Sequence, residues 1–324
     1  MTPDSSAPGS GRGVRSARCV LFAYHEAGYA CMEALLDLGA PITGLFTHRD
    51  AIDEEIWWRS CAELAAAHGI PVHTPEKLDD AALAEVRRCR PDVIYSAYYR
   101  SLLPAAILEI APLGAYNLHG SLLPSYRGRA PVNWMLVNGE SEGGMTLHHM
   151  VARADAGDIV AQRAVAIGDD DTALTLYRKI VPLGAALIRE FHPLIVAGRA
   201  PRHAQDLSRG SYCGRRRPED GRIDWQWPAR RIFNLVRAVT HPYPGAFCFV
   251  GGRKLFIWQT RIAAESGGGG QGGTILGRGS DGEVEVAAGD GRLLISRAQF
   301  ENQAENSAAS VFGELADRGA VRLE

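Results

Sequence analysis

The stretch RCVLFAYHEAGYACMEALLDLGAPITGLFTH, residues 18–48, decides the fold class of this 324-residue chain. Its first part, Arg18–Tyr24, is a short apolar run of the kind that forms a buried strand. An amphipathic run over Glu26–Leu38 follows and stops at Gly39, which is a typical helix end. Ile42–His48 then predicts a second strand. A strand, a helix and a strand in this order indicate a parallel sheet that is covered by helices.

The same alternation continues along the next 150 residues. Further elements are expected as helices over residues 54–68, 80–88, 104–110 and 171–198 and as strands over residues 92–98, 115–119, 145–150 and 158–167. The turn after the first strand reads YHEAGYA and contains neither GxGxxG nor GxxxxGK[ST], so the usual phosphate cradle of dinucleotide sites is missing. The pattern predicts an α/β domain over residues 17–204 that resembles a Rossmann sheet, preceded by a flexible tail over residues 1–16.

The pattern changes after a polar connection over residues 201–214. A helix is expected over Ala229–Val239, and short strands separated by turn residues follow it over residues 246–250, 254–259, 273–276, 284–287 and 292–296. Several short strands with turns between them are typical of a small β-barrel. The sequence therefore predicts a second, C-terminal domain over residues 205–324.

Composition excludes several classes of protein. Hydrophobic residues make up 46% of the chain and charged residues 22%, which favours a buried core over disorder. A net charge of -2 argues against nucleic acid as the main partner. No long uncharged apolar run and no apolar N-terminal segment occur, so we expect neither membrane insertion nor a secretory signal. The six cysteines lack metal-ligand spacing, which favours reduced thiols in the cytoplasm and no metal site.

The densest group of polar residues follows the predicted strand at residues 115–119. Asn117 and His119 lie two positions apart, so on a strand both side chains point to one face. An amide N–H can stabilise an oxyanion and an imidazole can move protons near neutral pH, which together suit acyl transfer. A carboxylate beside the imidazole would raise its pKa and fix its orientation. Asp155 is a good candidate, although the pattern alone does not choose it over Asp158.

A structural role for these residues is the competing interpretation. A histidine at a strand end is more often structural than catalytic, and an asparagine beside a turn commonly caps that turn. Ser121 lacks the GxSxG context of a nucleophile, so no acyl-enzyme is expected. On pattern alone, acyl transfer and a structural role have comparable weight.

Motifs around this group resemble those of a known family. NLHGSLLPSYRGRAP at residues 117–131, followed by Asp155, resembles the 10-formyltetrahydrofolate-dependent formyltransferase family. The second half adds IDW at residues 223–225 and VRAVTHPYPGAF at residues 236–247, so the resemblance covers roughly residues 18–300. It implies a Rossmann-like formyltransferase domain followed by a small OB-like β-barrel domain. It also implies 10-formyltetrahydrofolate as co-substrate.

The resemblance assigns roles to individual residues. Asn117 would stabilise the oxyanion, His119 would donate and accept the proton, and Asp155 would raise the pKa of His119. The positions that match the folate contacts of the family are Ser101, Leu102, Leu103, Arg129, Val151, Ala152, Arg153, Ala154 and Asp155.

Finer motifs point to the acceptor. HGSLLP at residues 119–124, ADAG at residues 154–157 and RGRAPVNWMLVNGE at residues 127–140 resemble one branch of the family. That branch is the formyltransferase domain of the bifunctional enzyme that acts on UDP-4-amino-4-deoxy-L-arabinose in lipid A modification and polymyxin resistance. The resemblance implies a nucleotide-sugar substrate and, because the decarboxylase domain is absent from this sequence, a possible separate decarboxylase partner. Methionyl-tRNA formylation, formyltetrahydrofolate hydrolysis and a non-catalytic folate or nucleotide-sugar sensor remain alternatives, and the oligomeric state is open.

Overall fold

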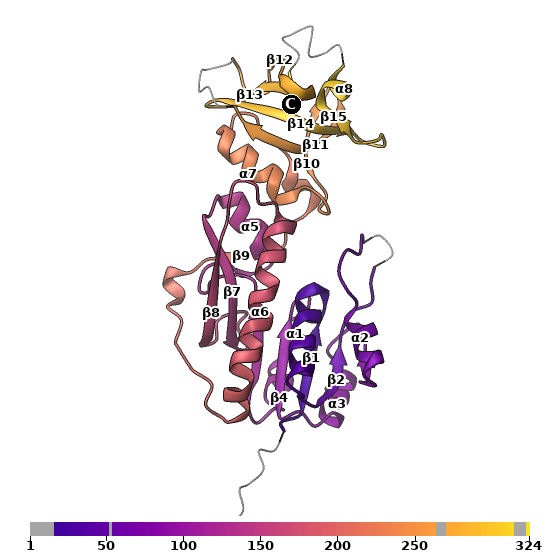
Figure 1. Ribbon diagram of the computed structural model, residues 1–324, viewed down its shortest axis with the longest axis vertical. Coiled ribbons are helices and arrows are strands. Elements are labelled where there is room, and N and C mark those ends of the chain that lie inside the picture. The colour runs from indigo at the N-terminus through magenta and orange to yellow at the C-terminus, as the bar shows by residue number, and fades with distance from the viewer. Residues whose placement is uncertain (1–15, 52–53, 264–269, 314–321) are drawn as a thin grey trace, which may run out of the picture.

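The computed structural model describes residues 16–51, 54–263, 270–313 and 322–324. Figure 1 shows an elongated molecule, with an α/β part that contains the N-terminal elements at one end and a β-rich part at the other. All but Ser16 of the predicted flexible tail lies outside the described residues. None of the described helices is both long enough and apolar enough to cross a membrane.

The α/β part is built on one seven-stranded sheet. Its strands follow the order β3-β2-β1-β4-β5-β7-β8. The five strands from β3 to β5 pair in parallel, whereas β7 and β8 run antiparallel to their neighbours. The strands are β1 (Cys19–Ala23), β2 (Ile42–Phe46), β3 (Val72–His73), β4 (Val93–Ala97), β5 (Ala115–His119), β7 (Glu142–His149) and β8 (Ile159–Ala166).

Helices cover both faces of this sheet. They are α1 (His25–Asp37), α2 (Cys61–Ala67), α3 (Asp80–Arg88), α4 (Ala105–Leu108) and α6 (Ala173–Val196). Side chains alternate along β1, so Val20 and Phe22 pack in one cluster with Val86 of α3 and Ile107 of α4. Leu21, between them, faces the opposite cluster, which includes apolar residues of α1 and α6. The Rossmann-like α/β prediction is confirmed.

Two local differences from the sequence-based prediction have simple causes. The helix expected over residues 54–68 begins only at Cys61, because the Ser60 side chain caps it by accepting a hydrogen bond from the Glu63 amide at 3.2 Å. Helix α5 (Pro131–Asn138) was not predicted. Its start is proline, which is favoured at the first helical position, and Gly139 ends it with a φ of 74°.

The C-terminal part begins with helix α7 (Ala229–Val239) and continues as an antiparallel sheet of order β10-β11-β14-β13-β12, with β15 paired to β14. Its elements are β10 (Ala246–Val250), β11 (Arg253–Ile262), β12 (Ile275–Arg278), β13 (Val284–Ala287), β14 (Arg292–Phe300), β15 (Asn306–Ser307) and α8 (Ala308–Phe312). Glu324 exchanges two backbone hydrogen bonds with Phe249 of β10, while Leu323 donates to the Gly273 carbonyl just before β12. The C-terminal residues therefore lie between the two edge strands of the sheet, β10 and β12. The β-rich C-terminal domain is confirmed, and its OB-like character and the boundary at residues 204/205 stay predictions.

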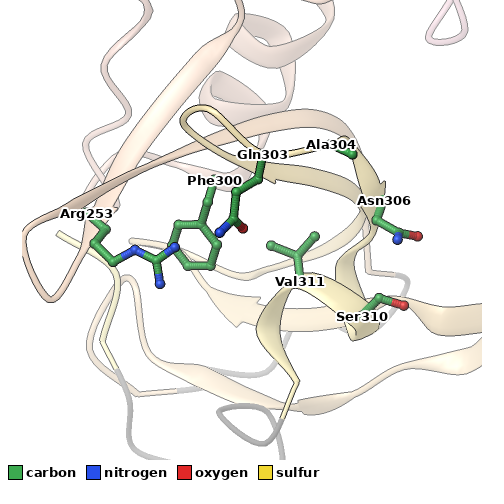
Figure 2. A pocket seen from close by; sticks show the side chains of 7 residues that line it. All are labelled: Arg253, Phe300, Gln303, Ala304, Asn306, Ser310 and Val311. Atoms are coloured by element: carbon green, nitrogen blue, oxygen red, sulfur yellow. The ribbon is translucent and has the colours of Figure 1, made fainter.

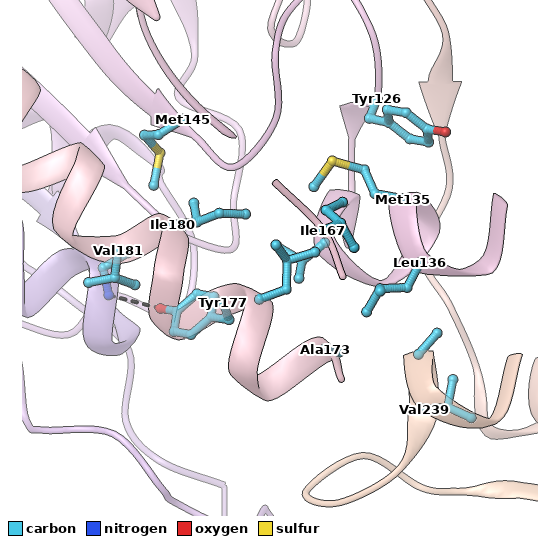
Figure 3. Close-up of a cluster of buried hydrophobic side chains, with 14 of the residues drawn as sticks. Tyr126, Met135, Leu136, Met145, Ile167, Ala173, Tyr177, Ile180, Val181 and Val239 are labelled. Carbon is cyan, nitrogen blue, oxygen red and sulfur yellow. Dashed lines mark hydrogen bonds between the residues drawn. The ribbon is translucent and has the colours of Figure 1, made fainter. Parts of the chain in front are cut away.

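The two parts share one apolar core. Figure 3 shows Met135 and Leu136 of α5 and Tyr177 of α6 in the same buried cluster as Val239 of α7. In addition, the Asn133 side-chain amide donates to the carbonyl of Ala238 at 2.7 Å. Helix α7 therefore packs against α5 and α6 and holds the β-rich part against the α/β part, beside the loop that follows β5.

Candidate active site

Strand β5 places Asn117 and His119 at its carboxyl end. Because side chains alternate along a strand, the two point to the same face of the sheet. Asn117 pairs with Ser96 of β4 on one side and stands opposite His148 of β7 on the other. Ligands of open α/β sheets bind outside the carboxyl ends of the strands, which is the position these side chains occupy.

Asp155 reaches this group from the loop between β7 and β8. Its φ is 51°, and the Gln205 side chain donates to its carbonyl at 3.0 Å. The carboxylate Oδ1 lies 3.3 Å from the amide nitrogen of Asn117 and 3.6 Å from Nδ1 of His119. The alternative, Asp158, instead forms an ion pair with Arg202 at 3.1 Å. The structure therefore brings Asp155 together with Asn117 and His119.

The orientation of the His119 ring is set by a backbone carbonyl. Its Nε2 lies 2.8 Å from the carbonyl oxygen of Tyr126. A carbonyl can only accept, so Nε2 carries a hydrogen and donates it. Nδ1, which faces Asp155, is then the nitrogen left to exchange a proton. Sequence reasoning expected the carboxylate to orient the ring, but the Tyr126 carbonyl makes the shorter contact.

His148 of β7 is a fourth member of the group and was not among the predicted site residues. Its Nδ1 lies 2.8 Å from its neighbour's carbonyl, that of His149, so Nδ1 donates and Nε2 is free to accept. That Nε2 lies 3.1 Å from the Asn117 amide nitrogen and 3.5 Å from Asp155. Strand register could have indicated this contact, because in an antiparallel β5–β7 pair His148 lies directly opposite Asn117.

Burial and charge act in opposite directions on the two ionisable groups. Burial lowers the pKa of His119, which is only 6% exposed, and outweighs the raising effect of Asp155. Burial would raise the pKa of Asp155, but His119, His148 and the Gly128 amide hold it well below its usual range. The net result is a neutral imidazole beside a carboxylate. Asp155 does act to raise the pKa of His119, as expected. Burial has the larger effect, so the pKa of His119 is lowered overall.

The predicted folate contacts lie on three loops: Ser101–Leu103 after β4, Arg129 after β5 and Val151–Asp155 between β7 and β8. Arg129 is exposed, and its Nη2 donates to the Arg100 carbonyl at 3.1 Å, which joins the loop after β5 to the Ser101–Leu103 loop after β4. Leu102 is 70% exposed and Val151 is 45% exposed, so both present apolar surface to the solvent. Leu103 is 5% exposed and belongs to the core. The remaining positions, Ser101, Ala152 and Arg153, are exposed, and Ala154 is half-buried.

Two surface hollows lie elsewhere and contain none of the predicted site residues. Figure 2 shows one of about 330 Å³ on the C-terminal sheet, where the Arg253 guanidinium stacks 4.0 Å from the centre of the Phe300 ring. The other, of about 500 Å³, lies beside β3 and α3 near His73 and Glu85. Within the described ranges, no group of three His, Cys, Asp or Glu side chains is arranged to hold a metal ion.

Comparison with solved structures finds the same fold at low sequence identity. WlaRD, a sugar 3N-formyltransferase crystallised with dTDP and 5-N-formyl-THF, shares 19% identity at a TM-score of 0.66, with 89% of this chain and 98% of that chain covered. An N-formyltransferase from Helicobacter canadensis, in complex with folinic acid and dTDP-3-aminofucose, shares 19% identity at a TM-score of 0.67, covering 86% and 98%. HypX from Aquifex aeolicus shares 18% identity at a TM-score of 0.63. That match covers 94% of this chain but only 48% of HypX.

Two family descriptions match the sequence itself. The formyl transferase family matches residues 49–190, which include Asn117, His119 and Asp155. The C-terminal domain of formyl transferases matches residues 216–315, which include most of the β-rich part. Since these two matches together cover well over half of its residues, the chain belongs to the formyl transferase family.

Proposed function

We propose that this protein transfers the formyl group of 10-formyltetrahydrofolate to the primary amine of a nucleotide-linked amino sugar. The observation that carries the proposal is the contact of Asn117, His119 and Asp155 at the carboxyl end of β5, with separations of 3.3 and 3.6 Å to the carboxylate. An amide donor, a neutral imidazole and a carboxylate in contact supply what acyl transfer to nitrogen requires.

The reaction follows from the roles these atoms can take. The amine attacks the formyl carbon as the free base, and the carbonyl oxygen becomes an oxyanion. The Asn117 amide carries two hydrogens, one directed at Nε2 of His148 at 3.1 Å and one at Asp155 at 3.3 Å. The hydrogen with the longer contact, to Asp155, is the one that Asn117 donates to the oxyanion. Nδ1 of His119 takes the proton from the attacking nitrogen and returns it to the leaving nitrogen of the folate. Asp155 stabilises the imidazolium that exists between these two steps.

The surroundings of the group support a folate donor. Exposed Leu102 on the loop after β4 and exposed Val151 on the loop that carries Asp155 offer apolar surface, and a flat pteridine ring needs such surface. Arg129, on the loop after β5, donates to the Arg100 carbonyl next to the loop that carries Leu102. The two sugar N-formyltransferases of similar fold are described with formylated folates bound, which supports the same co-substrate here.

The acceptor is proposed on two grounds. Structures of similar fold are described with dTDP or dTDP-3-aminofucose, which supports a nucleotide-linked amino sugar. The motifs at residues 119–124, 127–140 and 154–157 favour UDP-4-amino-4-deoxy-L-arabinose within that class, and hence a role in lipid A modification.

A coupled formylation assay tests this proposal. 10-Formyltetrahydrofolate is offered with UDP-4-amino-4-deoxy-L-arabinose, with dTDP-linked amino sugars and with methionyl-tRNA, and the release of tetrahydrofolate and the product mass are followed. We expect rapid turnover with the UDP-linked amine. Turnover with another amine only would keep the chemistry and reject this acceptor. Folate release without any amine would indicate a hydrolase, and no release at all would reject the catalytic proposal.

A further inference from the structure

Arg127 is a buried cation that has no counter-ion within the described part of the chain. It lies on β6 (Arg127–Gly128), its side chain is 5% exposed, and its Nε is buried without a hydrogen-bond partner. No ion pair of Arg127 occurs among the described residues, and the buried atom of its guanidinium that lacks a partner is Nε. By contrast, buried Arg237 has partners in Asn234 and the carbonyl of Gly168. Arg127 is thus the residue whose burial calls for an explanation.

Its chain neighbours hold the proposed catalytic residues. The carbonyl of Tyr126, one residue before, accepts from His119 at 2.8 Å. The amide of Gly128, one residue after, donates to Asp155 at 2.9 Å. Arg127 therefore stands in the segment that touches both ionisable groups of the site.

A second segment adds positive charge beside it. Strand β6 pairs with β9 (Tyr212–Cys213), and the backbone amide of Arg127 donates to the Ser211 carbonyl at 3.0 Å. Beyond β9 the chain reads Arg215, Arg216 and Arg217. Arg216 donates to the Asp220 carbonyl and stacks on Trp134, while Arg215 is exposed.

A buried guanidinium cannot relieve its cost by losing a proton, because arginine stays charged in proteins. An uncompensated buried charge is strongly destabilising, so its retention next to a reactive group indicates an anion that binds there. The arginines on the segment that follows β9 favour a polyanion such as a diphosphate over a single carboxylate, and guanidinium groups bind phosphate oxygens in pairs.

We propose that Arg127 binds the phosphate groups of the acceptor nucleotide and so directs the amino sugar toward His119. This inference rests on the proposed function, because it assumes a nucleotide-linked acceptor. Arg127 is then a specificity-determining residue, because acceptors that carry phosphate at the right distance from the amine bind more tightly. The exposed ring of Tyr212, which lies against Gly128, is placed to contact the base.

The test compares the wild type with Arg127→Met and Arg127→Lys. Binding of UDP, of inorganic pyrophosphate and of 5-formyltetrahydrofolate is measured by calorimetry, and the melting temperature of each protein is recorded with and without ligand. Arg189→Gln is the matched control, since Arg189 forms an exposed ion pair with Asp37 at 2.8 Å, on the surface of α6 and α1. These measurements need no turnover, so they remain informative if the proposed reaction fails.

We expect Arg127→Met to weaken UDP and pyrophosphate binding about tenfold to hundredfold. Arg127→Lys should recover part of that loss, and folate binding should change less than about twofold. Without ligand, Arg127→Met should melt no lower than the wild type, because it removes an unpaired buried charge.

Three results would overturn the inference. Unchanged UDP and pyrophosphate binding in Arg127→Met would show that no phosphate meets Arg127. A loss confined to the folate would assign the anion to a folate carboxylate instead. A large drop in the melting temperature of ligand-free Arg127→Met would show that the guanidinium is a structural group.

Discussion

The amide nitrogen of Asn117 lies 3.1 Å from Nε2 of His148, directly across the β5–β7 strand pair. The amide nitrogen of Asn117 can only donate, so Nε2 of His148 accepts this hydrogen bond while Nδ1 donates to the backbone. This contact fixes which side of the Asn117 amide carries the hydrogens. His148 is therefore proposed as the residue that positions the oxyanion donor, without itself touching the substrate.

The first prediction concerns this positioning role. His148→Leu removes the acceptor, so the Asn117 amide can rotate and its N–H no longer points in a fixed direction. We expect kcat to fall about tenfold to hundredfold, part of the loss typical for one oxyanion donor, with KM for the folate nearly unchanged. His148→Gln supplies an amide oxygen as acceptor and should recover much of the rate. Equal losses in both variants, or a rise in KM alone, would argue against the role.

The second prediction separates chemistry from binding. His119→Ala removes the proposed proton carrier, and Asp155→Ala removes the group that stabilises its charged form. Both should reduce turnover by about a hundredfold or more, while 5-formyltetrahydrofolate still binds. Steady-state rates and calorimetric binding measure the two effects. Near-wild-type turnover in either variant would reject the catalytic assignment.

The third prediction concerns the pH dependence of the reaction. Burial lowers the pKa of His119 below its usual value of about 6.5, so the acid limb of kcat/KM should lie below that pH. Asp155 acts to raise this pKa, and Asp155→Asn removes its charge. The acid limb of the variant should therefore move to still lower pH. Profiles of kcat/KM between about pH 5 and pH 9 measure this shift, and a limb that moves upward would contradict the assigned electrostatics.

The fourth prediction concerns acid stability. Burial lowers the pKa of five histidines in the folded protein: His25, His48, His119, His149 and His192. The unfolded chain therefore binds protons first, and stability is lost as pH falls from about 6.5 toward the folded pKa, which is about 3 for His25. Each such group contributes a slope of up to about 1.4 kcal/mol per pH unit in that window.

Calorimetric melting of two variants between about pH 7 and pH 5 tests this. His25→Asn keeps a residue that tolerates the positive φ of 67° but does not titrate, so its stability should fall less steeply with acid. His68→Gln, a change at an exposed histidine, serves as the matched control. An identical slope in all three proteins would show that His25 is not among the groups responsible.

Local pattern was sufficient for most of the main helices and strands of this protein, although not for α5, and for part of its site. Period-two alternation put Asn117 and His119 on one face of a strand whose bounds, Ala115–His119, the structure repeats. The bounds of Asp80–Arg88 also agree, since Asp79 caps that helix through its side chain. Such features depend on residues that are close in the chain, so a single sequence carries them.

Tertiary structure alone decided which distant groups meet. It placed Asp155 rather than Asp158 beside His119, and it brought His148 to Asn117 through the register of β5 and β7. It also left Nε of Arg127 buried without a hydrogen-bond partner among the residues that the structure describes. Strand register and burial arise from contacts between segments tens of residues apart, and burial sets the net pKa of His119. The sequence by itself therefore determined the residue types and their local geometry, and the packing of the whole chain determined their partners and their charge.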